Sequence, residues 1–470
     1  MKVDLVVING KLVLPEIGPT AGSLVVKGGQ IVRIAVPGQE PPADEILDAG
    51  GRVVLPGLVD PHVHYGWLLP LEDRIRAESA FGVSGGITTI MRYFRRPESY
   101  LTLFGEQIQM SNRVHYQDYA IHLTLFTENQ VAELRQYVER LGVTSFKIYT
   151  NMRGQFGRDV ALDLRPDSNS IETYNVDFSI GHLYEVFLAA SRVPARIRIS
   201  VHCEDGEVVC RGIDRARELG LGGLPAWHYA CPDIAEALAI SQVSVLSRAN
   251  NVPVYFPHIG SRASIKAVNE ARASGTDLVA ETCPHYLTQT TDCPAGVLAK
   301  IKPPIRTIDD QRAVWQAVHS GLIETIGSDH VGYMLREKNA EDIWQAHTAF
   351  PGTGLILPLL LSEGVNRNQI SLQQLSRITS YNAARAFGLY PQKGTMLPGA
   401  DADFVIVDLN QRWQVRANEL LSASDFSIYE GMELTGAVNI VYVRGIKVFE
   451  NGKVVGKVGH GKYINQVPVA

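Results

Sequence analysis

The chain has 470 residues, of which 45% are hydrophobic and 20% charged, an ordinary globular mixture that argues against disorder. Its net charge of -5, from 44 basic and 49 acidic side chains, gives no reason to expect nucleic acid as a partner. No apolar run approaches the ~20 residues of a membrane span. The first residues do not resemble a secretory signal. Five cysteines, an odd number without zinc-site spacing, suit free thiols in a reducing compartment. We therefore expect a cytoplasmic protein that binds neither nucleic acid nor membrane.

Short β-rich runs broken by glycine and proline occupy both ends of the chain. The first series covers residues 1–55 and contains turn signals such as Asn9-Gly10. The second covers residues 389–470 and contains a hairpin signal at Asn451-Gly452. Because the two ends share this pattern, we predict that together they form one small β-sandwich domain.

Between residues 56 and 388, short apolar runs rich in β-branched residues alternate with stretches of helical period, such as 131–141 and 234–249. Eight strands with helices between them are what a (β/α)₈ barrel requires. We therefore predict an α/β fold with a TIM-type barrel, in which the polar segment 154–180 is an inserted loop over one face. The predicted strands are 57–59, 88–91, 120–125, 145–149, 197–201, 252–256, 278–280 and 324–326.

Two histidines, His62 and His64, directly follow the first predicted barrel strand. Residues two apart in an extended backbone face the same way, so the pair could hold one metal ion together. The pair alone is a weak signal, because any two polar residues at the end of a strand would look the same.

Other polar residues stand at or just past the C-terminal ends of further strands, namely Lys147, His202, His258 and Asp329. In a barrel these ends converge on one rim, where the active sites of this fold lie. Taken singly, either histidine could be an ordinary hydrogen-bonding residue, Lys147 a solvated charge and Asp329 a helix N-cap. Their joint occurrence favours a metal site, and imidazole and carboxylate ligands suit zinc or a similar divalent ion.

Longer motifs surround these residues and continue to the end of the chain. They are Gly57-Leu58-Val59-Asp60-Pro61-His62-Val63-His64, Ser145-Phe146-Lys147, Val201-His202-Cys203-Glu204-Asp205-Gly206, Glu281-Thr282-Cys283-Pro284, Pro303-Pro304-Ile305-Arg306, Gly327-Ser328-Asp329-His330, Lys393-Gly394-Thr395, Pro398-Gly399-Ala400-Asp401-Ala402-Asp403 and Glu430-Gly431-Met432-Glu433. With these motifs the sequence resembles the hydantoinase and dihydropyrimidinase branch of the cyclic amidohydrolases, over nearly its whole length.

The resemblance implies a centre with two divalent metal ions, Zn²⁺ or alternatively Mn²⁺ or Co²⁺. His62 and His64 would hold the more buried ion, and His202 and His258 the more exposed one. Lys147 would be carboxylated on its amine (N6-carboxylysine) and bridge both ions. Asp329 would ligate the buried ion and also act as the catalytic proton shuttle.

The reaction that the resemblance implies is the opening of a cyclic amide or imide, such as a hydantoin or dihydropyrimidine ring. A hydroxide between the two ions would attack the amide carbon, and Asp329 would move its proton to the leaving nitrogen. The partner would be a small-molecule cyclic amide, and the family resemblance implies a homotetramer.

Several positions depart from the pattern of the branch and bear on the substrate. Met152 stands five residues after Lys147, where a ring-binding tyrosine is usual, and Tyr149 lies nearby. Lys302 replaces a serine before the Pro-Pro motif, and Thr348 stands where a backbone-contacting asparagine is expected before Pro351-Gly352. We interpret these four as candidate substrate contacts.

Two further candidates are Cys283 and Arg92. Cys283 lies in the Glu-Thr-Cys-Pro motif, although its hydrophobic surroundings also fit a small core residue. Arg92 stands at the C-terminal end of the second predicted strand, directly after residue 91, where an aspartate is usual, and is followed by Tyr93-Phe94-Arg95-Arg96. Dihydroorotases carry an arginine shortly after the paired histidines, and this chain has Tyr65-Gly66-Trp67 there, which disfavours that activity.

Arg92 and Lys302 should both point toward the barrel mouth and could bind a negative charge on the substrate, such as a carboxylate next to the ring. Alternatively, Arg92 pairs with a loop carboxylate and Lys302 contributes only its backbone.

Two other functions stay open. One is an allantoinase-type or other C–N hydrolase of the same superfamily that acts on an anionic substrate. The other is a non-catalytic scaffold on this fold, although scaffold relatives have lost metal ligands and here every ligand position is filled.

Overall fold

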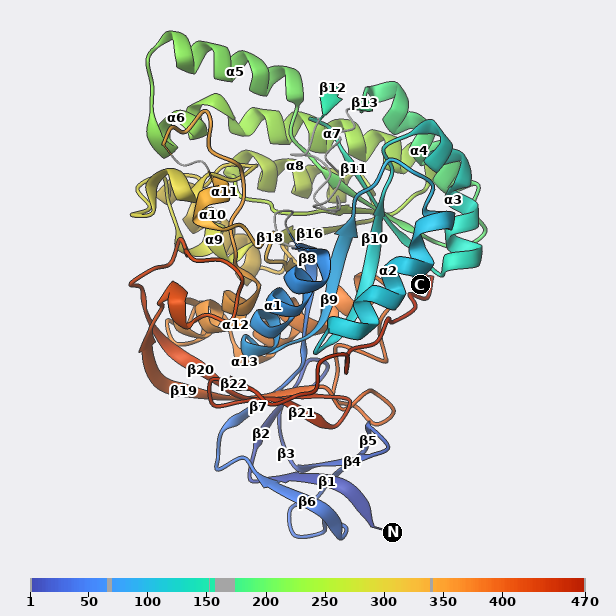
Figure 1. Ribbon diagram of the computed structural model, residues 1–470, viewed down its shortest axis with the longest axis vertical. Coiled ribbons are helices and arrows are strands. Elements are labelled where there is room, and N and C mark those ends of the chain that lie inside the picture. The colour runs from blue at the N-terminus through green and yellow to red at the C-terminus, as the bar shows by residue number, and fades with distance from the viewer. Residues whose placement is uncertain (1, 66–69, 152, 157–173, 339–340, 469–470) are drawn as a thin grey trace.

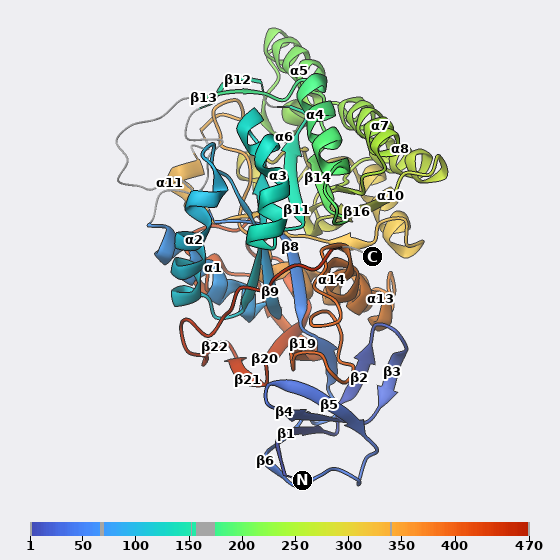
Figure 2. The same cartoon turned by 90° about the vertical axis from the view of Figure 1, so that its right-hand side faces the viewer.

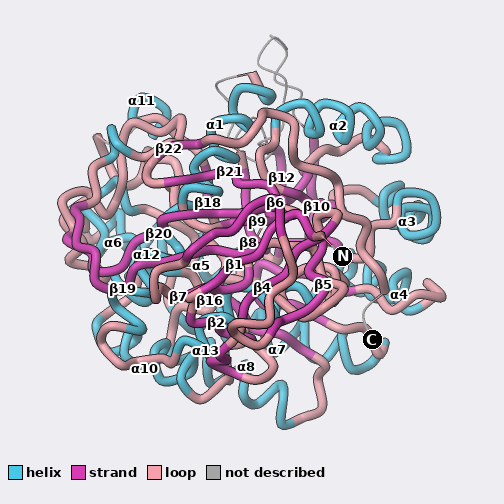
Figure 3. Tube along the Cα trace, turned by 90° about the horizontal axis from the view of Figure 1, so that it is seen from below, coloured by secondary structure: helices cyan, strands magenta, loops and turns pink. Residues whose placement is uncertain are grey.

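The computed structural model describes residues 2–65, 70–151, 153–156, 174–338 and 341–468. Parallel strands form a barrel with helices around it, and a β-rich unit lies below the barrel (Figure 1). Figure 2 shows the same two parts from the side, and Figure 3, seen from below, shows strands gathered in the middle with helices around them. The predicted fold class, a TIM-type barrel with a small β-sandwich, is confirmed.

The barrel sheet contains strands near every predicted position, and all its pairs are parallel. Its buried strands are rich in Val, Ile and Leu, as expected of strands covered on both faces. In sheet order they are β17 (Thr325–Ile326), β16 (Leu278–Thr282), β15 (Val254–Phe256), β14 (Arg198–His202), β11 (Ser145–Tyr149), β10 (Asp118–Thr124), β9 (Ile87–Phe94), β8 (Leu58–His64) and β18 (His330–Val331).

The last barrel position is divided into two short strands. β17 pairs with β16, whereas β18 pairs with β8 and so closes the barrel. Residues 327–329 lie between these two strands and turn the chain at the rim. Asp329 is therefore held at the junction between the last strand and the first, next to the end of β8.

Helices follow most of the barrel strands. Specific residues fix both ends of helix α3. Thr127 and Gln130 form a capping box at its start, and Gly142, in the left-handed conformation, ends it. The helices are α1 (Leu71–Ser84), α2 (Tyr100–Val114), α3 (Glu128–Leu141), α4 (Ile180–Ser191), α5 (Gly206–Glu218), α6 (Gly223–Ala230), α7 (Asp233–Asn250), α8 (Arg262–Ala273), α9 (Pro284–Thr288), α10 (Ile308–His319), α11 (Leu335–Lys338), α12 (Ile356–Leu359), α13 (Leu372–Ser376) and α14 (Asn382–Ala386).

The inserted segment differs from the prediction where it is described. Residues expected to form a loop include an antiparallel pair of strands, β12 (Arg153–Phe156) and β13 (Tyr174–Asp177). The residues between these two strands lie outside the described ranges.

The β-rich unit contains two sheets built from both ends of the chain. The four-stranded sheet has the order β5 (Gln30–Ala35), β4 (Ser23–Lys27), β1 (Val3–Ile8) and β6 (Ala43–Asp48). The seven-stranded sheet has the order β22 (Lys453–Val454), β21 (Ile446–Glu450), β20 (Glu433–Val443), β19 (Phe404–Gln414), β7 (Val53–Pro56), β2 (Lys11–Leu14) and β3 (Gly18–Ala21). Antiparallel pairing of β7 with β19 joins the two ends, and side chains such as Leu5, Leu24 and Phe404 form the core of this unit.

The last residues of the chain return to the barrel. The backbone of Tyr119 in β10 exchanges hydrogen bonds with Lys462 and Ile464. The buried amide of Gln466 donates to the Ser145 hydroxyl at 2.7 Å, and its oxygen accepts from the Thr144 N–H at 2.8 Å. The C-terminal segment thus supports β11 only two residues from Lys147. None of the helices in the described ranges has both the length and the apolar character needed to cross a bilayer.

Candidate metal centre and active-site pocket

Three potential metal ligands converge at the C-terminal rim of the barrel. His62 and His64 lie on one face of β8, and Asp329 lies between β17 and β18. All three are buried, and one ligand atom of each lies within 4.8 Å of the others. Nε2 of His62 is 3.0 Å from Oδ1 of Asp329, and Nε2 of His64 is 3.8 Å from the same oxygen. Two imidazoles and a carboxylate in this arrangement suit one divalent ion.

The field around His62 favours a positive charge. Although burial lowers the pKa of His62, the carboxylates of Asp329 and Glu281 outweigh burial and raise that pKa to about 9. Burial also opposes ionisation of Asp329, yet His62 keeps the pKa of this carboxyl below its usual value. The same two carboxylates would stabilise a metal cation at this point.

A second pair of imidazoles lies beside the first cluster. His202 ends β14, His258 follows β15 by two residues, and Nδ1 of His202 is 2.9 Å from Nε2 of His258. The amide nitrogen of Asn151 is 2.8 Å from Nε2 of His202 and also donates to Glu204 at 3.1 Å. Burial lowers the pKa of both histidines and so favours their neutral form, in which an imidazole carries one lone pair that can bind an ion.

Two of these side chains stand on unusual backbone conformations. His258 has a φ of 47° and Asp329 a φ of 50°, in the left-handed region that residues other than glycine seldom adopt. Such conformations cost ~1–3 kcal/mol and are concentrated at functional sites. The fold therefore holds both residues in strained positions at the barrel rim.

Lys147 lies on β11 between the two imidazole clusters and is 1% exposed. Its ammonium is 4.8 Å from the centre of the Tyr93 ring and 5.2 Å from that of Tyr149. Burial lowers the pKa of Lys147 to about 8. Within the described ranges, its Nζ has no hydrogen-bond partner, and neither has Nδ1 of buried His64. These orphaned polar atoms fit a centre that is completed by further groups.

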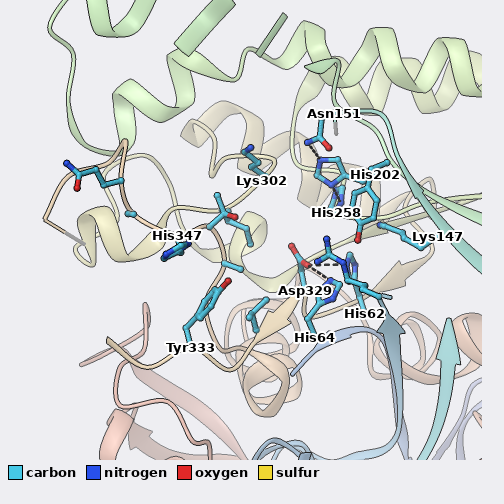
Figure 4. A pocket seen from close by; sticks show the side chains of 18 of the residues that line it. His62, His64, Lys147, Asn151, His202, His258, Lys302, Asp329, Tyr333 and His347 are labelled. Carbon is cyan, nitrogen blue, oxygen red and sulfur yellow. Dashed lines mark hydrogen bonds and ion pairs between the residues drawn. The ribbon is translucent and has the colours of Figure 1, made fainter. Parts of the chain in front are cut away.

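A cavity of about 410 Å³ opens over these residues. Figure 4 shows the imidazoles, Asp329 and Lys147 on one side, and Lys302, Tyr333 and His347 across the cavity from them. The size is typical of a small-molecule site. The cavity therefore gives a small ligand access to both imidazole clusters.

Comparisons with known proteins agree with this geometry. The model of the Amidohydrolase family matches residues 228–455. The chain is 30% identical to a D-hydantoinase from Geobacillus stearothermophilus, covering 94% of this chain and 92% of that protein. The chain belongs to the amidohydrolase family, in its hydantoinase branch.

Further relatives span almost the full chain. An L-hydantoinase from Paenarthrobacter aurescens is 29% identical and covers 98% of both chains. The solved structure of an L-hydantoinase (dihydropyrimidinase) from Arthrobacter aurescens superposes with a TM-score of 0.89, at 28% identity, covering 99% of this chain and 100% of that one. Membership of this family, together with the cluster of His62, His64 and Asp329, supports the use of a divalent metal ion.

Only some of the residues predicted to contact the substrate line the cavity. Tyr149, Lys302 and Thr348 line the cavity. Cys283 does not: its side chain is fully buried at the start of α9 and belongs to the hydrophobic core. Met152 lies outside the described residues.

The expectation that Arg92 points toward the barrel mouth is wrong. Arg92 is fully buried on the outer side of the barrel, where it donates to Gln107 of α2 at 2.7 Å. Its guanidinium lies 5.1 Å from the ring centre of Phe94. β9 continues to Phe94, beyond its predicted end at residue 91, and successive side chains alternate between its faces. Tyr93 therefore contacts His62 and His64, while Arg92 faces away.

Several residues around the site were not predicted as site residues. Arg95, the first residue after β9, lines the cavity and lies 5.1 Å from the Tyr149 ring centre. Glu281, Asn151 and Glu204 contact the candidate ligands. Arg95, Glu204 and Glu281 belong to motifs or runs noted in the sequence. Whether their side chains point into the site depends on where the strands end, and the sequence pattern did not define those ends.

Proposed function

We propose that this protein is a divalent-metal-dependent hydrolase that opens a small cyclic amide at a C–N bond, with a hydantoin- or dihydropyrimidine-like ring as substrate. The observation that carries the proposal is the convergence of His62, His64 and Asp329 within 4.8 Å on the floor of a ligand-sized cavity. The names of its relatives, among them L-hydantoinase, D-hydantoinase and dihydropyrimidinase, support the same substrate class.

We propose a centre of two ions, with Zn²⁺ as the metal. His62, His64 and Asp329 would hold one ion, and His202 and His258 the other. Lys147, carboxylated on Nζ, would hold both, which supplies a partner for an amine that is buried without one among the described residues. When bound, such ions supply Lewis acidity, which activates water near neutral pH and polarises a carbonyl group.

The chain itself supplies orientation and proton transfer. Asp329 lies 3.0 Å from His62 and lines the cavity, so it can take a proton from an attacking water and donate it to the leaving ring nitrogen. Asn151 and Glu204 hold the His202 ring in place. Tyr149 and Thr348 border the space left for the ring.

Ring opening assayed on hydantoin, dihydrouracil and allantoin tests the proposal. The metal-loaded protein should open hydantoin or dihydrouracil, and a chelator should abolish turnover. Turnover of allantoin alone would favour the allantoinase-type alternative. Fully metal-loaded protein that turns over none of the three would favour a non-catalytic scaffold.

We propose three further features of the protein. The domain boundaries at residues 55/56 and 388/389 follow the change of sequence pattern. A homotetramer follows the resemblance to the branch. A cytoplasmic location follows the five cysteines, all of them free thiols.

A further inference from the structure

We propose that the physiological substrate carries a negative charge on a substituent of the ring, and that Lys302 binds this charge on the cavity wall opposite the metal ligands. The inference rests on the proposed function and specifies its substrate class: a cyclic amide with an anionic side chain, such as a carboxylate. Lys302, and not Arg92, is the residue expected to recognise it.

Lys302 is placed to meet such a substituent. It lines the cavity across from the imidazoles (Figure 4), so a ring whose amide reaches Asp329 would direct its substituent toward this wall. The side chain is half-buried, and its ammonium is 5.6 Å from the ring centre of Trp227. Among the described residues, none forms a hydrogen bond or ion pair with this ammonium. The donors of Lys302 are therefore available to a ligand.

Two buried lysines add positive charge behind the same wall. Lys300 is 4% exposed and donates to the carbonyl of Ala346 at 2.7 Å. Lys338 is fully buried and donates to the carbonyls of Lys300 and Ala349, at 3.0 and 2.5 Å. Burial, followed by the proximity of Lys302, lowers the pKa of Lys300 to about 8, as expected where positive charge exceeds its counter-charge.

Two carboxylates act electrostatically on these lysines, Glu204 on Lys302 and Asp342 on Lys300, but neither of them lines the cavity. Glu204 is fully buried and accepts from Asn151 at 3.1 Å. Asp342 accepts from the backbone N–H of Trp344 at 3.3 Å. Of the described residues that line the cavity, Asp329 is the only one with a carboxylate, and it belongs to the metal cluster. An anionic group on the ligand would supply the missing negative charge.

Hydrogen bonds also fix the backbone of the cavity wall that carries Lys302. The N–H of Ala349 donates to the carbonyl of Lys300 at 2.9 Å, and the N–H of His347 donates to the carbonyl of Lys338 at 2.9 Å. Together with the two lysine ammonium groups, these bonds join the segment 346–349 to the segment that carries Lys302. Such pre-organisation reduces the ordering that a ligand must impose when it binds.

The test uses two matched substrates, a hydantoin with a carboxyethyl side chain and its carboxamide counterpart, which differ in charge and hardly in shape. We would measure kcat/KM and, by calorimetry, the dissociation constant of each with the wild type, Lys302→Met and Lys302→Arg. A charge-assisted hydrogen bond is worth about 10- to 150-fold in binding. The wild type should prefer the carboxylate, Lys302→Met should reduce the carboxylate-to-carboxamide ratio by about that factor, and Lys302→Arg should largely keep it.

Lys266→Met is the matched control, because it removes an equal charge from an exposed lysine on α8 that is 3.8 Å from Glu270. This control should leave the ratio unchanged. Equal affinity of the wild type for both compounds, or an equal loss on both in Lys302→Met, would overturn the inference while ring opening still supported the proposed function. If metal-loaded protein opens neither ring, the proposed function fails. The dissociation constants of the two compounds then still show whether Lys302 favours the negatively charged one.

Discussion

The carboxylate of Glu281 lies 2.8 Å from Nδ1 of His62, on the side of the ring away from Asp329. The same carboxylate accepts the hydroxyl of Tyr255 at 2.8 Å and the backbone N–H of His258 at 3.2 Å. One fully buried side chain of β16 thus orients a ligand on β8 and the backbone that carries a ligand of the second cluster. With Nδ1–H donated to Glu281, the Nε2 lone pair of His62 is directed toward the metal position.

Glu281→Gln should therefore weaken metal binding although Glu281 is not itself a proposed ligand. Glutamine keeps the shape but loses the charge that makes the His62 ring more basic. Loss of such a supporting group typically costs 10- to 100-fold in metal affinity. Competition with a chromogenic chelator measures the affinity, and unchanged affinity would show that Glu281 has no such role.

Tyr255→Phe is a graded control for the same contact, because it removes only the hydroxyl that donates to the second oxygen of Glu281. We expect its effect on metal affinity to have the same direction as that of Glu281→Gln but to be smaller.

Much of the fold could be predicted because its signals are local and repeated. The strand 145–149 was predicted with the same bounds that β11 has, and the helical stretch 131–141 lies within α3. The six proposed metal ligands could be found in the sequence because they stand at or just past the predicted C-terminal ends of strands, and parallel strands in a barrel bring these ends to one rim.

The contacts around those ligands could not be predicted, because they depend on which face of a strand each residue occupies. Arg92 was interpreted as the end of the second strand because it stands where this branch usually has an aspartate. Instead, the barrel and α2 accommodate it as a buried cation, the strand continues to Phe94, and Arg95 is the residue that lines the cavity. Buried arginine is rare, so propensity alone ends the strand too early.

The bridging role of Lys147 predicts coupled loss of metal and activity. Lys147→Ala removes the only proposed ligand that would contact both ions, so the purified variant should fall from about two metals per chain and lose ring-opening activity. Short carboxylic acids should partly restore both, because they can occupy the place of the carbamate. Metal analysis and turnover are the measurements, and a variant with full metal content and normal turnover would exclude bridging.

Replacement of Asp329 by asparagine tests proton transfer. Asp329→Asn preserves size and one ligand oxygen but removes the base, which typically costs ~10²–10⁴-fold in kcat. Weaker metal binding should add to this loss, so kcat is to be compared at saturating metal. Activity within a few-fold of the wild type would mean that another group transfers the proton.

A buried ion cluster joins the barrel to the β-sandwich. Nζ of Lys393, 1% exposed, lies 2.8 Å from Oδ2 of Asp403, 3.0 Å from Oδ2 of Asp401 and 2.5 Å from Oδ2 of Asp118. Asp118 begins the barrel strand β10, whereas Asp401 and Asp403 directly precede β19. The Lys393 ammonium therefore contacts carboxylates from both parts of the molecule, and the Arg444 guanidinium forms a second ion pair with Asp118.

Lys393→Met should destabilise the whole chain, because Asp401 and Asp403 lose their ion-pair partner while they stay buried beside one another, and only Asp118 keeps a cation, Arg444. Breaking a buried ion pair by removing one partner typically costs ~3–5 kcal/mol of unfolding free energy. Urea denaturation followed by circular dichroism should show a lower midpoint for Lys393→Met. The exposed Lys266→Met variant should retain the wild-type midpoint, since an exposed pair with Glu270 contributes little. Equal midpoints for Lys393→Met and the wild type would show that the cluster does not stabilise the junction of the two parts.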